Sequence, residues 1–215
     1  MIRKFHVFGD SWARGDGVSS LKTFSWRIFK YLGLENHQYG NHGLSGNSNK
    51  VIRDQILSTE FKKDDFILVV WTTPHRDDAN ELLSREEYFK NNGIVNLKHF
   101  PQYIKDVEKH LKGNNYKMTQ CFNPIFGYDY KLEVDVDGSN FIEWGKPNNT
   151  LLDILTENWC NNNNRNYWMN DKVKQNERFK DRFQIDKHHP SGLGNKIIAD
   201  KLLTYIDMRK DHVSS

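Results

Sequence analysis

Cysteine is scarce in this sequence. Its 215 residues include only two cysteines, Cys121 and Cys160, which lie far apart and lack the spacing of a metal-binding pair. A framework of disulfide bonds is therefore not expected, and a reducing compartment is mildly favoured. Aromatic residues make up 13% of the chain, so large side chains can supply the buried apolar surface.

Long apolar runs and an excess of charge of one sign are also lacking. No segment approaches the roughly 20 apolar residues that cross a bilayer, and residues 1–4 do not lead into the apolar core of a signal peptide. The 31 basic and 28 acidic residues nearly cancel, which does not call for a nucleic-acid or membrane partner. We therefore expect a soluble, cytoplasmic protein with a single domain over residues 1–215. Its oligomeric state is left open.

Short apolar segments alternate with amphipathic ones along most of the chain. The expected strands cover residues 4–8, 38–41, 65–71 and 116–122. The expected helices carry apolar residues over 24–32, 48–61, 101–111 and 197–206, the first of them capped by Ser19 or Ser20. The segment 65–71 is apolar from Phe66 onwards, as strands covered on both faces of a parallel sheet are. This order predicts an α/β domain with a mainly parallel sheet.

Residues 124–182 fit that pattern worst and are expected to form a variable insertion. The alternation over residues 131–136 and the turn sequence Asp137-Gly138 predict a β-hairpin there, and residues 149–159 have a helical pattern. An insertion at this place either shapes a substrate pocket or forms a surface loop.

Two motifs carry candidate chemistry. Gly9-Asp10-Ser11 follows the first strand, at the edge where open α/β sheets bind ligands, so the Ser11 hydroxyl is a candidate nucleophile that needs a base. Asp10 is expected to accept backbone hydrogen bonds and hold this turn. Near the other end of the chain, Asp186 and His189 are three residues apart, so the carboxylate can orient the imidazole towards a serine. Alone, this second motif also fits a polar loop before a helix.

With both motifs on one chain, the sequence resembles the SGNH hydrolases, also called GDSL esterases and lipases. The matching blocks are Phe8-Gly9-Asp10-Ser11, Asn41-His-Gly43-Leu-Ser45-Gly46 and Asp186-x-x-His189-Pro190-Ser191. The resemblance implies a three-layer α/β/α sandwich with a flavodoxin-like sheet. It also implies Ser11 as nucleophile, His189 as general base and Asp186 as its orienter, with the backbone N–H groups of Ser11 and Gly46 in the oxyanion hole.

One block departs from the family. The third block of the family is Gly-x-Asn-Asp, and its Asn side chain donates to the oxyanion, whereas this chain has Trp71-Thr-Thr-Pro-His-Arg76. Removing one such donor can lower the rate about a hundredfold or more. Thr72, Thr73, Arg76 or Asn47 could replace it, and Arg76 could also bind an anionic substrate. Alternatively, the protein is a weak or inactive relative.

The expected reaction is hydrolysis of a small acyl ester, such as an acetyl ester, on a polar or carbohydrate carrier, without metal or cofactor. Two other classes stay open. Asp10, Asp186, His188 and His189 could hold a divalent ion in a metal-dependent hydrolase. An inactive domain could instead bind a glycan or a protein through its many aromatic residues.

Overall fold

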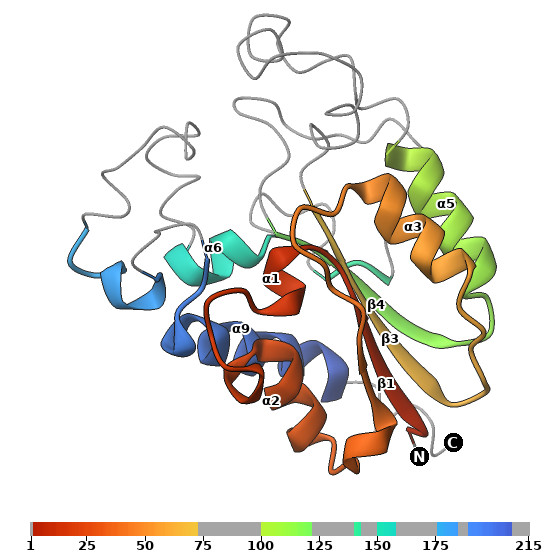
Figure 1. Ribbon diagram of the computed structural model, residues 1–215, viewed down its shortest axis with the longest axis horizontal. Coiled ribbons are helices and arrows are strands. Elements are labelled where there is room, and N and C mark those ends of the chain that lie inside the picture. The colour runs from red at the N-terminus through yellow and green to blue at the C-terminus, as the bar shows by residue number, and fades with distance from the viewer. Residues whose placement is uncertain are drawn as a thin grey trace, which may run out of the picture.

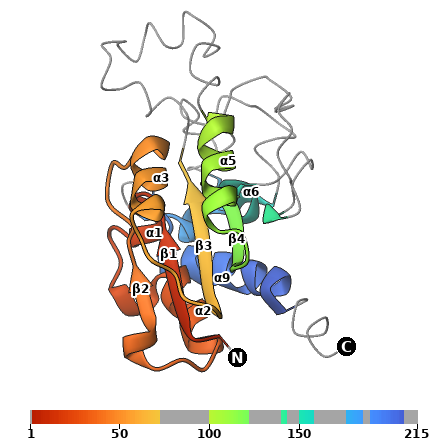
Figure 2. The same cartoon turned by 90° about the vertical axis from the view of Figure 1, so that its right-hand side faces the viewer.

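The computed structural model describes residues 2–72, 100–121, 140–142, 150–157, 176–184 and 189–207. Their centre is a parallel sheet in the order β2-β1-β3-β4, which Figure 2 shows edge to edge. The strands are β1 (Lys4–Phe8), β2 (Tyr39–Asn41), β3 (Asp65–Trp71) and β4 (Asn115–Gln120). This order begins as a flavodoxin-like sheet does, and the predicted α/β class is confirmed.

Helices cover both faces of the sheet (Figure 1). They are α1 (Ser11–Arg14), α2 (Phe24–Tyr31), α3 (Asn49–Leu57), α5 (Phe100–His110), α6 (Leu151–Thr156) and α9 (Gly192–Asp207). Single 3-10 turns cover Ser20–Lys22, Asn36–Gln38 and Lys180–Arg182. Side chains alternate along β3: Phe66, Leu68 and Val70 join the core under α2 and α9, and Ile67, Val69 and Trp71 join the core under α3 and α5. Two apolar cores therefore enclose the sheet in three layers.

Several expected boundaries shift, for local reasons. The cap of α2 is Thr23, whose hydroxyl accepts from the Trp26 N–H, rather than Ser19 or Ser20. The helix expected to reach residue 61 ends at Leu57, because the Ser58 and Thr59 hydroxyls both donate to the Gln55 carbonyl. Of the insertion, the hairpin expected over 131–138 lies outside the described residues.

The helix expected over 149–159 is present as the shorter α6. Thr150 and Asp153 cap its start reciprocally, as a capping box. Burial raises the pKa of the Asp153 carboxyl to about 6. The sequence pattern thus located this helix within the insertion but overestimated its length.

Two stacked histidines, the buried His6 and the half-buried His42, join β1 to the chain that follows β2. His6 Nδ1 lies 3.1 Å from His42 Nε2, and His42 stacks on Phe8 with 4.3 Å between ring centroids. His6 is 4% exposed. Burial, reinforced by the positive charge of Lys4, lowers the pKa of His6 to about 4, and burial also lowers the pKa of His42. Both imidazoles are therefore neutral near pH 7.

Across the described ranges, no helix combines the length and the apolar character needed to span a membrane.

Candidate active site

Ser11 lies where the chain leaves the carboxyl end of β1 and turns into α1. Asp10 caps this helix by accepting the Trp12 N–H at 2.9 Å, and Gly15 ends it in the left-handed conformation. Ser11 is 5% exposed. As the first residue of the helix, it has an N–H with no acceptor inside the helix. That N–H is therefore placed to meet a negatively charged group at the edge of the sheet.

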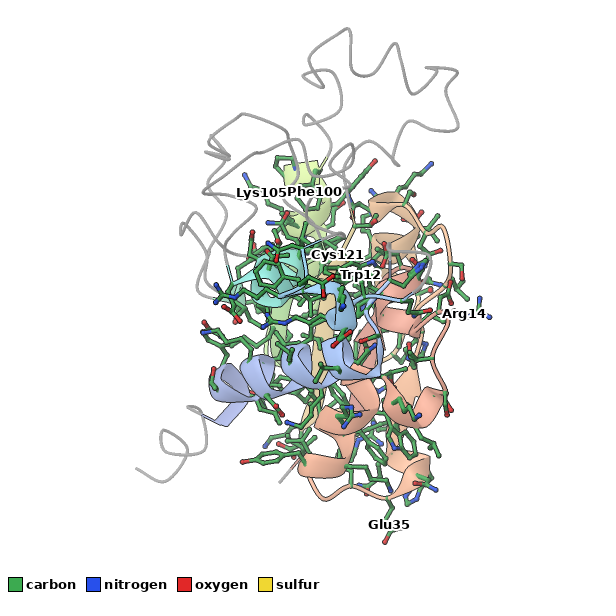
Figure 3. The ribbon with its side chains drawn as sticks, turned by 90° about the vertical axis from the view of Figure 1, so that its left-hand side faces the viewer. Trp12, Arg14, Glu35, Phe100, Lys105 and Cys121 are labelled. Atoms are coloured by element: carbon green, nitrogen blue, oxygen red, sulfur yellow. The ribbon has the colours of Figure 1, made fainter. Side chains whose placement is uncertain are left out.

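Asp10 is fully buried and holds this turn together. Besides the Trp12 N–H, its carboxylate accepts from the Thr72 hydroxyl at 2.7 Å and from the Cys121 thiol at 3.3 Å. Trp12 and Cys121 lie close together at this end of the sheet (Figure 3). The role expected for Asp10 is confirmed, and its carboxylate links the ends of β1, β3 and β4.

The loop after β2 lies alongside the Ser11 turn. The His42 N–H donates to the Val7 carbonyl at 2.8 Å, and the Leu44 N–H donates to the Gly9 carbonyl at 3.2 Å. Gly43 approaches α1 so closely that an added Cβ would lie 2.5 Å from the Arg14 nitrogen. Gly46, with a φ of 78°, is exposed. The loop that carries the expected second oxyanion donor is thus fixed beside the candidate nucleophile.

Two of the candidate replacements for the missing Asn already donate elsewhere. The Asn47 amide Nδ2 donates to the Gly9 carbonyl at 3.1 Å and to Gln55 Oε1 at 3.3 Å. The single hydrogen of the Thr72 hydroxyl is directed at Asp10. These contacts argue against both side chains as oxyanion donors. Thr73 and Arg76 lie outside the described residues.

Asn49 is a residue of this region that the sequence analysis missed. It is fully buried at the start of α3. Its Oδ1 accepts the Thr72 N–H at 2.9 Å, and its Nδ2 donates to the Thr72 carbonyl at 3.2 Å. Asn49 therefore pairs with the end of β3 as a neighbouring strand would. The only signal in the sequence is its place three residues after the second block.

Gln184 links the segment that carries His189 to the loop after α1 by hydrogen bonds. The Gln184 N–H donates to the His189 carbonyl at 2.9 Å. Its side-chain Nε2 donates to the carbonyls of Asp16 at 2.6 Å and Pro190 at 3.0 Å. Asp16 lies two residues after the end of α1. The Gln184 side chain therefore joins the loop after the candidate nucleophile's helix to the segment of the candidate base.

Asn195, near the start of α9, makes a second set of linking hydrogen bonds. Its Oδ1 accepts the Phe24 N–H at 2.8 Å, and its Nδ2 donates to the Pro190 carbonyl at 3.1 Å. The chain from His189 to α9 is thereby held against the start of α2. His189 itself is half-buried. Asp186 and His188 lie outside the described residues.

No protein-family model and no curated protein match the sequence. Solved structures do match. A protein from Lactobacillus plantarum matches with a TM-score of 0.54 and 14% identity, covering 96% of this chain and 97% of that one. A member of the lipolytic protein G-D-S-L family from Veillonella parvula has a TM-score of 0.48 and 12% identity, over 94% and 96% of the two chains.

A psychrotrophic esterase from Pseudoalteromonas sp., solved as inhibited by monoethylphosphonate, has a TM-score of 0.49 and 10% identity, over 97% of this chain and 99% of that one. At such identities a likeness concerns the fold. The chain is therefore an α/β protein whose fold is similar to that of the Lactobacillus plantarum protein.

Proposed function

We propose that this protein is a serine esterase of the SGNH type. The observation that supports the proposal is that the loop of Gly46 and the segment of His189 both contact the stretch of chain that begins with Ser11. Gly43 packs the loop of Gly46 against α1, and Gln184 ties the segment of His189 to Asp16 behind the same helix. A nucleophile, a general base and backbone donors are the parts that acyl transfer requires. The three sequence blocks that resemble the SGNH hydrolases support the same conclusion.

The proposed reaction passes through an acyl-enzyme. Ser11 Oγ attacks the ester carbonyl while His189 takes its proton, and the proton then goes to the departing alcohol. Asp186 orients the imidazole. The N–H groups of Ser11 and Gly46 donate to the oxyanion, and water then releases the acid by the same steps. No metal or cofactor takes part.

Covalent labelling tests this proposal. A small fluorophosphonate is expected to add one phosphonyl group per chain, on Ser11, because only an activated serine reacts with it. Intact mass and peptide mapping would locate the adduct, and Ser11→Ala should stay unlabelled. Labelling unaffected by a chelator would also remove the metal-dependent alternative. An unlabelled parent under conditions that label a serine esterase would contradict the proposal.

The inactive binding domain is the second candidate, and one observation favours it. Asn47 and Thr72, both considered as replacements for the missing donor, direct their hydrogens to Gly9, Gln55 and Asp10. A site with two backbone donors has less stabilisation for the oxyanion. An unlabelled Ser11 together with glycan binding that survives Ser11→Ala would establish this second function.

We further propose a small acyl group, such as acetyl, on a polar or carbohydrate carrier. Polar side chains at the end of α1 and in the loops after α1 and β2 interact beside the site: Arg14 donates to Ser45 Oγ at 3.0 Å, and the Ser45 hydroxyl donates to Asp16. Such a rim suits a hydrophilic leaving group. We expect kcat/KM for p-nitrophenyl acetate to exceed that for the palmitate at least about tenfold. Faster hydrolysis of the palmitate would contradict this substrate class.

A further inference from the structure

The end of β3 supports the Ser11 turn from behind. Thr72 is 1% exposed, and both of its backbone groups pair with Asn49. This double pairing fixes the direction in which the Thr72 hydroxyl points, which is at Asp10 Oδ2. The hydrogen bond is short, as expected for an O–H donor on a carboxylate.

The end of β4 supports the same carboxylate at its other oxygen. Cys121 is fully buried directly after β4, and its thiol donates to Asp10 Oδ1. Its own N–H donates to the Trp71 carbonyl at 2.9 Å, and its carbonyl accepts the Leu152 N–H at 3.0 Å. Cys121 is therefore held on both sides, by β3 and by α6. A thiol is a weak donor, so its contribution is smaller than that of Thr72.

Asp10 connects Thr72 and Cys121 to the turn that carries Ser11. Its Oδ1 also accepts the Trp12 N–H, and its carbonyl accepts the Arg14 N–H at 2.9 Å, so two residues that follow Ser11 are tied to Asp10, which precedes it. A four-residue helix has little stability of its own. The position of Ser11 therefore depends on how firmly the Asp10 carboxylate is held.

We propose that Thr72 and Cys121 are positioning residues for Ser11 and act through Asp10. This inference rests on the proposed function, since it gives both residues a part in the same reaction. It also assigns Thr72 a role other than that of an oxyanion donor. An error of about 1 Å in the position of a reacting group can lower a rate about a hundredfold.

The test compares Thr72→Val with Thr72→Ser. Valine keeps the shape of threonine and removes the O–H donor, whereas serine restores the donor. The matched control is Thr119→Val on β4, because Thr119 is equally buried and its hydroxyl makes no hydrogen bond in the described part of the chain. Three quantities are measured: kcat and KM for p-nitrophenyl acetate, the rate of phosphonylation of Ser11, and hydrogen exchange of the amides of residues 11–15.

Thr72→Val is expected to lower kcat and the phosphonylation rate at least about tenfold with KM nearly unchanged, and to speed exchange in α1. Thr72→Ser should recover most of the loss, and Thr119→Val should behave as the parent. Cys121→Ala should lower kcat and the phosphonylation rate by less than Thr72→Val does. Cys121→Ser, which keeps a donor, should lower them less than Cys121→Ala.

Equal losses in Thr72→Val and Thr119→Val would overturn the inference, as would parental exchange and phosphonylation in Thr72→Val. If the parent neither hydrolyses esters nor reacts with the fluorophosphonate, the proposed esterase fails, and with it the catalytic part of this inference. Hydrogen exchange in α1 would still decide whether Thr72 positions the Ser11 turn.

Discussion

Replacing Ser11 or His189 by alanine is expected to lower kcat/KM for p-nitrophenyl acetate at least about a thousandfold. Without the hydroxyl no acyl-enzyme forms, and without the imidazole the hydroxyl keeps its proton, so each change removes the whole covalent route. Residues that act as one unit do not add, so the double variant should be no slower than either single one. Asp186→Ala should cost less, because nucleophile and base both remain.

The controls are a serine and a histidine away from this edge of the sheet. Ser58 is exposed at the end of α3, and the side chain of His37 is 76% exposed. Ser58→Ala and His37→Gln should retain parental kcat/KM. Similar slow hydrolysis by the parent, Ser11→Ala and His189→Ala would mean that the turnover does not arise at the proposed site.

The free energy of unfolding is expected to fall as the pH is lowered from about 6.5 to about 4, with a contribution from His6 of at most about 3 kcal/mol. The pKa of His6 is about 4 in the folded protein and 6.5 in its unperturbed state. Between these values the unfolded chain binds more protons, so acid favours unfolding. The contribution is fully present above about pH 6.5 and is lost as the pH falls towards 4.

Burial of the ring is the main cause of the lowered pKa of His6, and the charged groups that face the ring modify it. Lys4, His42 and Arg3 disfavour the charged imidazole, whereas Asp65, with Oδ2 3.7 Å from His6 Nε2, favours it. Asp153 acts in the opposite direction, because its raised pKa contributes stability at low pH that is lost as the pH rises through about 6. The parental profile alone therefore does not isolate His6.

The measurement is urea unfolding of the parent and His6→Phe at several values of pH between 4 and 7. Phenylalanine keeps a ring for the contacts with Phe8 and Phe61 and does not titrate. The free energy of unfolding of the parent, relative to that of His6→Phe, should fall as the pH is lowered. His37→Gln should follow the parent. A difference that is constant with pH would contradict the assignment to His6.

The sequence predicted the strands well because burial on both faces leaves a clear pattern. The predicted strand 65–71, apolar from Phe66 onwards, coincides with β3, and the predicted strand 4–8 coincides with β1. Two parallel strands need crossover helices, so the alternation of elements also determined the layers. The cap of α2 was less certain, because Ser19, Ser20 and Thr23 each fit the start of a helix; Asn195, from the other end of the chain, binds the N–H of Phe24 directly after the cap.

The hydrogen bonds around the Ser11 turn were predictable only in part. The turn at Gly9-Asp10-Ser11 and the holding role of Asp10 followed from local chemistry. The direction of the Asn47 and Thr72 donors did not, because it depends on Gly9, Gln55 and Asp10, which only the folded chain brings within reach. The helix α1 was not predicted either, since four residues carry no periodic pattern.

The hydrogen bond between Asn195 and Phe24 has a consequence for folding during synthesis on the ribosome. The Phe24–Asn195 hydrogen bond joins positions 171 residues apart, so its formation costs more loop-closure entropy than a local contact does. The partners of the nucleophile turn are synthesised by residue 121, well before His189 leaves the ribosome. A nascent chain therefore holds its serine without a base. On the proposed mechanism, docking of α9 onto α2 is the step that turns the growing polypeptide into an enzyme.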